Sequence, residues 1–298
     1  MKRKNVLLAL SNLLLILVFS LSIFNPIPVY ADSYISVTLG ADLSDEQKQQ
    51  MLDYFKVTQN DANILEVTSQ EEYDALGKVA TSAQLGTKSI SCSYVEPTNS
   101  GGLDITTNNL TWVTEGMIKN ALITAGITDA KVIAAAPFKV SGTAALTGIL
   151  KGFENNSNGE KLDENNKEAA NEELFVTGEL GDEIGQDDAT NLINEIKTKV
   201  VKESPKTEDE VNNIVDDVIS KYNYKLSEDT INKIKSLMNK INDLNLDYSS
   251  IKSQLKDISN NLKDKISSDE AKGFFSKIGS FFSQIGKFFS KLWNAIFN

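Results

Sequence analysis

The 298-residue sequence contains no histidine, a single cysteine and only five prolines. The absence of histidine excludes Ser-His-Asp triads, histidine general bases and most zinc sites, because each of these needs an imidazole. The lone cysteine, Cys92, cannot form an intramolecular disulfide or a CxxC pair. It lies in an alternating strand pattern, so we expect a buried thiol without chemistry. The sequence therefore gives no catalytic residue, no metal ligand and no cofactor.

Charge and composition narrow the class of protein further. Acidic residues outnumber basic ones by 41 to 30, which gives a net charge of -11. Such a chain repels phosphate backbones, so we expect no nucleic-acid partner. Because 41% of the residues are apolar, the chain can bury at least one sizeable core, and a wholly disordered protein is excluded.

Residues 1–31 have the three-part pattern of a cleavable secretory signal peptide. Three basic residues precede an apolar run from residue 6 to 24, and the segment ends in Val-Tyr-Ala31. An uncleaved membrane anchor is the competing interpretation, because the run approaches the roughly 20 residues that span a bilayer. Two prolines after the run favour cleavage after Ala31. We therefore expect an exported protein, either extracellular or in the cell envelope.

Residues 32–155 are expected to form an α/β sandwich domain, within an α+β or α/β fold. After a first alternating strand pattern, Ser44-x-x-Gln47 is a capping box that opens a helix. A second strand pattern follows, and Ser69-x-x-Glu72 predicts a second capping box and helix.

The second half of this domain carries further strand and helix patterns. Lys88–Glu96 and Leu103–Trp112 flank a Ser-Gly-Gly turn and predict a hairpin, which would mix antiparallel pairing into the sheet. Thr114 can cap the next helix. The buried strand Ala130–Ala136 then leads to a last helix, which Ser141 can cap.

Lys139, Ser141, Gly142 and Thr143 form our candidate anion or ligand pocket. They join the end of a strand to the start of a helix, where free backbone N–H groups and the helix dipole attract an anion. The alternative is that Ser141 merely caps its helix and Gly142 allows close packing on the sheet.

Three strings in the sandwich region form a recognisable pattern. They are Tyr94-Val-Glu-Pro97, Thr111-Trp-Val-Thr114 and Ala134-Ala-Ala-Pro-Phe-Lys-Val-Ser-Gly-Thr-Ala-Ala-Leu-Thr-Gly148. On these strings the chain resembles the YpuA-like family of predicted secreted proteins, largely from Gram-positive bacteria, which is domain of unknown function 1002. The resemblance is close from about residue 34 to 153 and implies export and an envelope setting. It implies no catalytic residue, because the family has no established activity.

The next part of the chain changes in composition. Residues 156–186 are expected to be an acidic linker that contains glycine and asparagine. Within it, the acidic string 178–188 either binds calcium weakly or is simply hydrated. Residues 187–270 contain no glycine and a single proline, Pro205, so we expect a helical region of three or four helices. The apolar stripe over 231–266 fits either a helical hairpin or one long helix.

Residues 271–298 are expected to form an amphipathic helix at a membrane interface. Three tandem copies of one seven-residue unit (FFSKIGS, FFSQIGK and FFSKLWN) hold six of the chain's 13 phenylalanines. At about 100° per residue, apolar side chains fill one half of the helix and polar ones the other. The apolar half consists of Phe274, Phe275, Ile278, Phe281, Phe282, Ile285, Phe288, Phe289, Leu292, Trp293, Ile296 and Phe297. The cations of the polar half are Lys277, Lys287 and Lys291.

The charge of this segment opposes that of the rest of the chain. Residues 273–298 carry +3, whereas residues 32–272 hold 24 basic and 41 acidic residues, a net -17. A helix of this kind lies flat on an anionic membrane surface, and its lysines argue against a span. The alternative partner is protein, either a second copy or another envelope protein packed on the C-terminal helices.

The function predicted from the sequence is that of an exported, envelope-associated and non-enzymatic protein. Its C-terminal helix would dock it peripherally on the outer face of the cytoplasmic membrane. One alternative is a secreted homo-oligomeric or partner-binding module, and another is an enzyme that acts on an envelope polymer through carboxylates.

Overall fold

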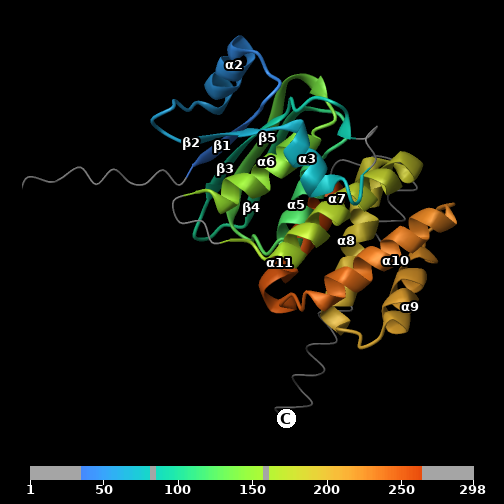
Figure 1. Ribbon diagram of the computed structural model, residues 1–298. Helices are drawn as coiled ribbons and strands as arrows, with labels where there is room; N and C mark the ends of the chain where they lie inside the picture. Colours follow the sequence, from blue (N-terminus) through green and yellow to red (C-terminus); the bar gives the residue numbers. More distant parts are fainter. Residues whose placement is uncertain (1–34, 81–84, 157–160, 264–298) are drawn as a thin grey trace, which may run out of the picture. The chain divides into compact units, whose positions relative to one another are not determined.

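The computed structural model describes residues 35–80, 85–156 and 161–263, with side chains placed up to residue 260 (Figure 1). The expected signal segment 1–31 and the expected amphipathic helix 271–298 lie outside the described residues. The strands are β1 (Ser36–Gly40), β2 (Asn63–Val67), β3 (Cys92–Pro97), β4 (Leu103–Leu110) and β5 (Ala130–Val140). The helices are α2 (Asp45–Phe55), α3 (Ser69–Leu76), α5 (Glu115–Thr124), α6 (Thr143–Glu154), α7 (Glu164–Ile184), α8 (Gln186–Glu203), α9 (Glu208–Ile219), α10 (Glu228–Asp243) and α11 (Tyr248–Lys263). The predicted class, a mixed sheet followed by helices, is confirmed.

The described strands form one five-stranded sheet in the order β2-β1-β3-β5-β4. β1 pairs parallel with β2, and β4 pairs parallel with β5, while β3 is antiparallel to both of its neighbours. The expected mixture of parallel and antiparallel pairing is therefore confirmed. The predicted hairpin is wrong, because β5 lies between the two strands that the Ser-Gly-Gly turn connects. β5 takes this inner position because its small apolar side chains can be covered on both faces of the sheet.

Local capping chemistry sets where the first helices begin. The Ser44–Gln47 capping box and the Thr114 cap are both confirmed. The second capping box begins one residue earlier than predicted, at Thr68. The Thr68 hydroxyl accepts from the N–H of Glu71, and the Glu71 carboxylate accepts from the N–H of Thr68. Glu72 consequently turns inward and is only 2% exposed.

Helix α6 packs on one face of the sheet through glycine, and α2 covers the opposite face. A Cβ placed on Gly148 would lie 2.1 Å from Thr38 Oγ1 and 3.0 Å from Ser93 Oγ. The hydroxyls of Thr38 and Ser93 hydrogen-bond to each other beneath the helix. The glycine therefore allows a backbone approach that leaves no room for a side chain.

The segment expected to be a linker is mostly helical. α7 runs through 21 residues of it, and Asp163 caps its start by accepting from the N–H groups of Asn165 and Asn166. The glycines that suggested a loop are contact points, since a Cβ on Gly178 would lie 2.0 Å from the Trp112 ring. The linker prediction is wrong, because Gly178 lies inside α7 and allows close packing instead of forming a turn.

The helical region expected over 187–270 is confirmed as far as the structure describes it, with α8 to α11 as its helices. Residues 244–247 separate α10 from α11, and Asn245 in this break has a φ of 52°. The stripe over 231–266 is therefore not one continuous helix.

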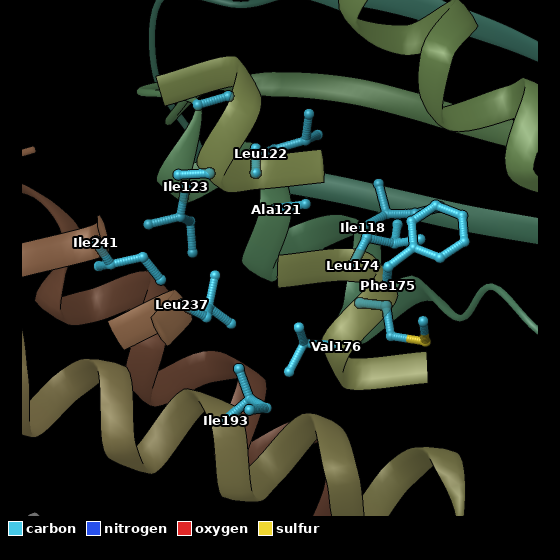
Figure 2. Close-up of a cluster of buried hydrophobic side chains, with 14 of the residues drawn as sticks. Ile118, Ala121, Leu122, Ile123, Leu174, Phe175, Val176, Ile193, Leu237 and Ile241 are labelled. Atoms are coloured by element: carbon cyan, nitrogen blue, oxygen red, sulfur yellow. The ribbon is translucent and has the colours of Figure 1, made fainter. Parts of the chain in front are cut away.

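One hydrophobic core joins the sheet to the helical region. Figure 2 shows side chains from α5, α7, α8 and α10 meeting in it, among them Leu122, Phe175, Ile193 and Leu237. The same cluster reaches β3, β5 and α6 on one side and α11 on the other. Residues 32–155 and 187–270 therefore do not have separate cores. A second cluster lies under α2, and all members of both clusters fall between residues 35 and 258.

A fully buried ion pair lies within this shared core. Lys197 of α8 and Glu173 of α7 are both 0% exposed, and their Nζ and Oε1 atoms are 2.7 Å apart. The lysine also donates to the carbonyl of Asn120 (2.9 Å) and to the hydroxyl of Thr124 (3.2 Å), both in α5. Burial lowers the pKa of Lys197, and Glu173 opposes this. The pair thus ties three helices together at one point.

The close approach of α6 to the sheet predicts a contrast between two glycines on that helix. Gly148→Ala should lower the free energy of unfolding by about 1–3 kcal/mol, because the new methyl group overlaps Thr38. Gly152→Ala should be neutral or stabilise by up to about 1 kcal/mol, since its nearest neighbours are 3.4 Å away and alanine favours helix. Urea unfolding of both variants tests this, and equal effects would contradict the packing described.

Candidate functional site

A cleft of about 430 Å³ opens between α3, α6 and α7. The three helices lie beside one another on the α6 side of the sheet (Figure 1). The lining residues are Glu71, Asp74, Ala75, Lys78 and Val79 from α3 and the turn after it, Thr147, Leu150, Lys151 and Glu154 from α6, and Glu164, Lys167, Glu168 and Asn171 from α7. Its volume lies within the range of small-molecule sites in proteins, about 300–1,000 Å³.

Helical periodicity explains why these residues share the cleft. On α6 the lining positions are 147, 150, 151 and 154, and on α7 they are 164, 167, 168 and 171. Both sets follow the spacing i, i+3, i+4, i+7, which places four side chains on one face of a helix. Positions 71, 74, 75 and 78 repeat this spacing through α3 and the residues after it. The cleft is therefore formed by one polar face from each of three helices.

Ion pairs connect each pair of walls. Lys151 of α6 lies 2.5 Å from Glu71 of α3 and also donates to the carbonyl of Glu66. Glu154 of α6 lies 2.8 Å from Lys167 of α7.

The third connection runs between α7 and the end of α3. Lys78 lies 3.6 Å from Glu168, and the amide of Asn171 donates to the carbonyl of Ala75 at 3.2 Å. The walls are thus held at a fixed spacing without closing the space between them.

Two lining residues have oxygen atoms without a hydrogen-bond partner. Thr147 is 8% exposed and Asn171 is 7% exposed, and neither Thr147 Oγ1 nor Asn171 Oδ1 has a hydrogen-bond partner among the described residues. Most buried polar atoms in proteins are paired, so such atoms need an explanation. An amide oxygen can only accept, so what Asn171 Oδ1 lacks is a donor.

The charged groups of the cleft are suited to binding. Burial lowers the pKa of Lys167, but the hydrogen bonds that it donates to Glu154 and Glu164 raise it more, so the lysine stays protonated and is not a free base. Burial alone would raise the pKa of Glu71, but bonds from Lys151 and the Thr68 N–H lower it, so it stays ionised. Within the described part of the chain, no group of three or more acidic or cysteine side chains could hold a metal ion.

The four residues of the expected anion pocket do not line this cleft. β5 extends to Val140, so Lys139 is an exposed strand residue. The expectation that Ser141 caps α6 is wrong, because the N-cap is Gly142, with a φ of 105° and no side-chain cap bond. Ser141 instead offers its carbonyl to the N–H groups of Trp112 and Val113.

An internal carboxylate lies at the start of α6, where a ligand anion was expected. The hydroxyl of Thr143 donates to Glu72 Oε2 at 3.0 Å, and the N–H of Ala145 donates to the Ser91 hydroxyl at 2.8 Å. Thr143, Glu72 and Ser91 are all buried. Burial raises the pKa of Glu72, although the hydrogen bond from Thr143 opposes the shift. The protein itself therefore fills the position that the helix dipole favours for an anion.

The other singled-out positions lie away from the cleft. Cys92 is fully buried under α2 as expected, and burial raises its pKa to about 12, which makes its thiol unreactive. The acidic string 178–188 is not a loop, because it forms the last turns of α7 and the first turn of α8. The fifteen expected membrane-interface residues, from Phe274 to Phe297, lie outside the described residues.

Neighbouring glutamates at the edge of this region predict opposite pH dependences. The lowered pKa of Glu71 gives stability that is present above about pH 4.5 and is lost as the pH falls. The raised pKa of Glu72 has the reverse effect, because ionising it costs stability as the pH rises above 4.5. Relative to the parent, Glu71→Gln should therefore lose stability with rising pH, whereas Glu72→Gln should gain it.

Urea unfolding of the parent and both variants between pH 3.5 and pH 7 measures this. Glutamine at position 71 can still serve the capping box, so a loss in that variant reports on the charge. Parallel curves for the two variants would contradict the assignment.

The comparisons with known proteins agree with the resemblance drawn from the three strings. The family described as "Protein of unknown function (DUF1002)" matches residues 39–258, a range that contains all the cleft residues and ends before the C-terminal segment. A relative, "Uncharacterized protein YpuA" of Bacillus subtilis (strain 168), is 44% identical over 205 residues, covering 68% of this chain and 70% of the relative. No solved structure matches the chain significantly. The chain belongs to the DUF1002 family.

Proposed function

We propose that this protein is exported and docks peripherally on the outer face of the cytoplasmic membrane through residues 271–298. The observation that carries the proposal is the C-terminal sequence, in which three copies of one heptad separate large apolar side chains from lysines. Helices with this division lie in the interface of anionic membranes. In this proposal the rest of the protein has a binding role at that surface and no catalytic one.

The burial of the folded part supports lipid over protein as the partner of this segment. Within the described residues, the exposed large hydrophobic side chains are Tyr54, Tyr73 and Phe138, which come from α2, α3 and β5. Exposed apolar side chains in this small number are normal on protein surfaces. A face of twelve large apolar residues therefore has no evident counterpart on the described part of its own chain.

The energetics also favour this proposal. Twelve large apolar side chains at roughly 1 kcal/mol each offer on the order of 10 kcal/mol for insertion into the interface. The three lysines add attraction to anionic lipid, while the net charge of -17 over residues 32–272 repels that surface. The segment should therefore hold the acidic folded part of the protein near the membrane, without direct contact between that part and the lipid surface. None of the described helices is long and apolar enough to cross a bilayer.

Sedimentation with liposomes tests the proposal. A chain of residues 32–298 should pellet with anionic vesicles, less with neutral ones and less at high salt, whereas residues 32–272 should stay in solution. Both chains contain every member of the two described hydrophobic clusters, so both should fold.

Two substitutions of equal charge separate the apolar face from the polar one. Phe281→Asp puts a carboxylate on the apolar half and should abolish pelleting, whereas Ser283→Asp puts it on the polar half and should only weaken it. Equal losses in the two variants would contradict an interfacial helix. If residues 32–298 ignore lipid and sediment as an oligomer that residues 32–272 do not form, the segment packs on protein and membrane docking is wrong.

A further inference from the structure

We propose that the cleft between α3, α6 and α7 binds a small soluble molecule that carries primary ammonium groups. This inference is independent of membrane docking. It depends on three features of the cleft, which are its shape, its charge and its unpartnered oxygen atoms.

The shape of the cleft fits a small ligand. Helices form the walls on three sides, and cross-helix ion pairs such as Lys151–Glu71 and Glu154–Lys167 keep them at a fixed distance. The lining includes Leu150 and the partly buried Val79, which give an alkyl chain an apolar contact. The space is thus formed before any ligand arrives, which lowers the entropic cost of binding.

The charge of the cleft selects a cation. Its lining holds five carboxylates and three lysines, and Lys240 from outside the lining pairs with Glu168 at 3.5 Å, which leaves a net charge of -1. Lys78, Lys151 and Lys167 each lie within 4.0 Å of a carboxylate, so no lining lysine is left for an anionic ligand. Asp74 is different, because it lines the cleft and, among the described residues, accepts a hydrogen bond from the neutral side chain of Gln70 and forms no ion pair. An anionic carboxylate without a cation is available to a ligand.

The unpartnered amide oxygen of Asn171 requires a hydrogen-bond donor, whereas the Thr147 hydroxyl can accept or donate. Asn171 Oδ1 and Thr147 Oγ1 belong to residues that line the cleft and have no partner within the described structure. An ammonium group presents three donors and no acceptor, so it matches a lining in which acceptors are in excess. A neutral polyol can also donate, but it gains nothing from the net negative charge.

Calorimetric titration of residues 32–298 with putrescine tests the proposal, with butanediol as the uncharged ligand of the same chain length. Putrescine should bind at low salt and butanediol should not. In amide NMR spectra, putrescine should shift the signals of α3, α6 and α7, including the side-chain amide of Asn171.

The chain offers a matched pair of variants. Asp74 accepts from Gln70 at 2.8 Å, and Asp53 on α2 accepts from Gln49 at 2.9 Å, in both cases from four residues earlier. Only Asp74 lines the cleft, so Asp74→Asn should weaken putrescine binding about two- to fivefold, and Asp53→Asn should leave it unchanged.

Three results would overturn the proposal. The first is the absence of putrescine binding up to millimolar concentration, and the second is equal binding of butanediol. The third is an equal loss of affinity in the two aspartate variants, which would show that general charge rather than this cleft attracts the amine.

Discussion

The buried charge of Lys197 is the constraint on which the arrangement of helices depends. A lysine with no exposed surface is tolerated only with full compensation, and Glu173, Thr124 and the Asn120 carbonyl supply it. Apolar burial has no directional preference, whereas the hydrogen bonds of these polar atoms need a specific geometry. α8 is thereby fixed against α5 and α7, and it cannot separate from α5 without breaking the lysine's hydrogen bonds to Asn120 and Thr124.

Helix α7 links the buried ion pair to the cleft, because it contains Glu173 and also forms one wall of the cleft. Trp112, which follows β4, packs on Phe175 at 5.2 Å between ring centroids and fits against Gly178. On the same side of the sheet, Gly148 lets α6 lie close to Thr38. Because interior contacts fix the positions of α6 and α7, they also fix the positions of the polar faces on the outer side of these helices. The cleft is therefore a consequence of packing, and its ion pairs keep open a space that the core has already defined.

Sequence reasoning succeeded where structure is local and failed where it depends on distant partners. Ser44 and Thr114 were found because a cap involves residues only three apart. The second capping box was missed by one residue because Thr68-x-x-Glu71 and Ser69-x-x-Glu72 both satisfy the pattern. The hairpin prediction is wrong because β5, which comes later in the chain, lies between β3 and β4 in the sheet. The cleft cannot be predicted from the sequence, because each of its walls, taken alone, has the pattern of a solvated helix face.

The central structural claim is that the sheet and the helical region form one unit. Urea unfolding of residues 32–272 tests it most directly, because Trp112 is then the sole tryptophan and lies where the two regions meet. Fluorescence of Trp112 reports on that contact, while far-UV circular dichroism reports on the helices throughout. The account predicts coincident transitions by the two probes. Helical signal that persists after Trp112 has become exposed would contradict it, since the helices would then be stable without the shared core.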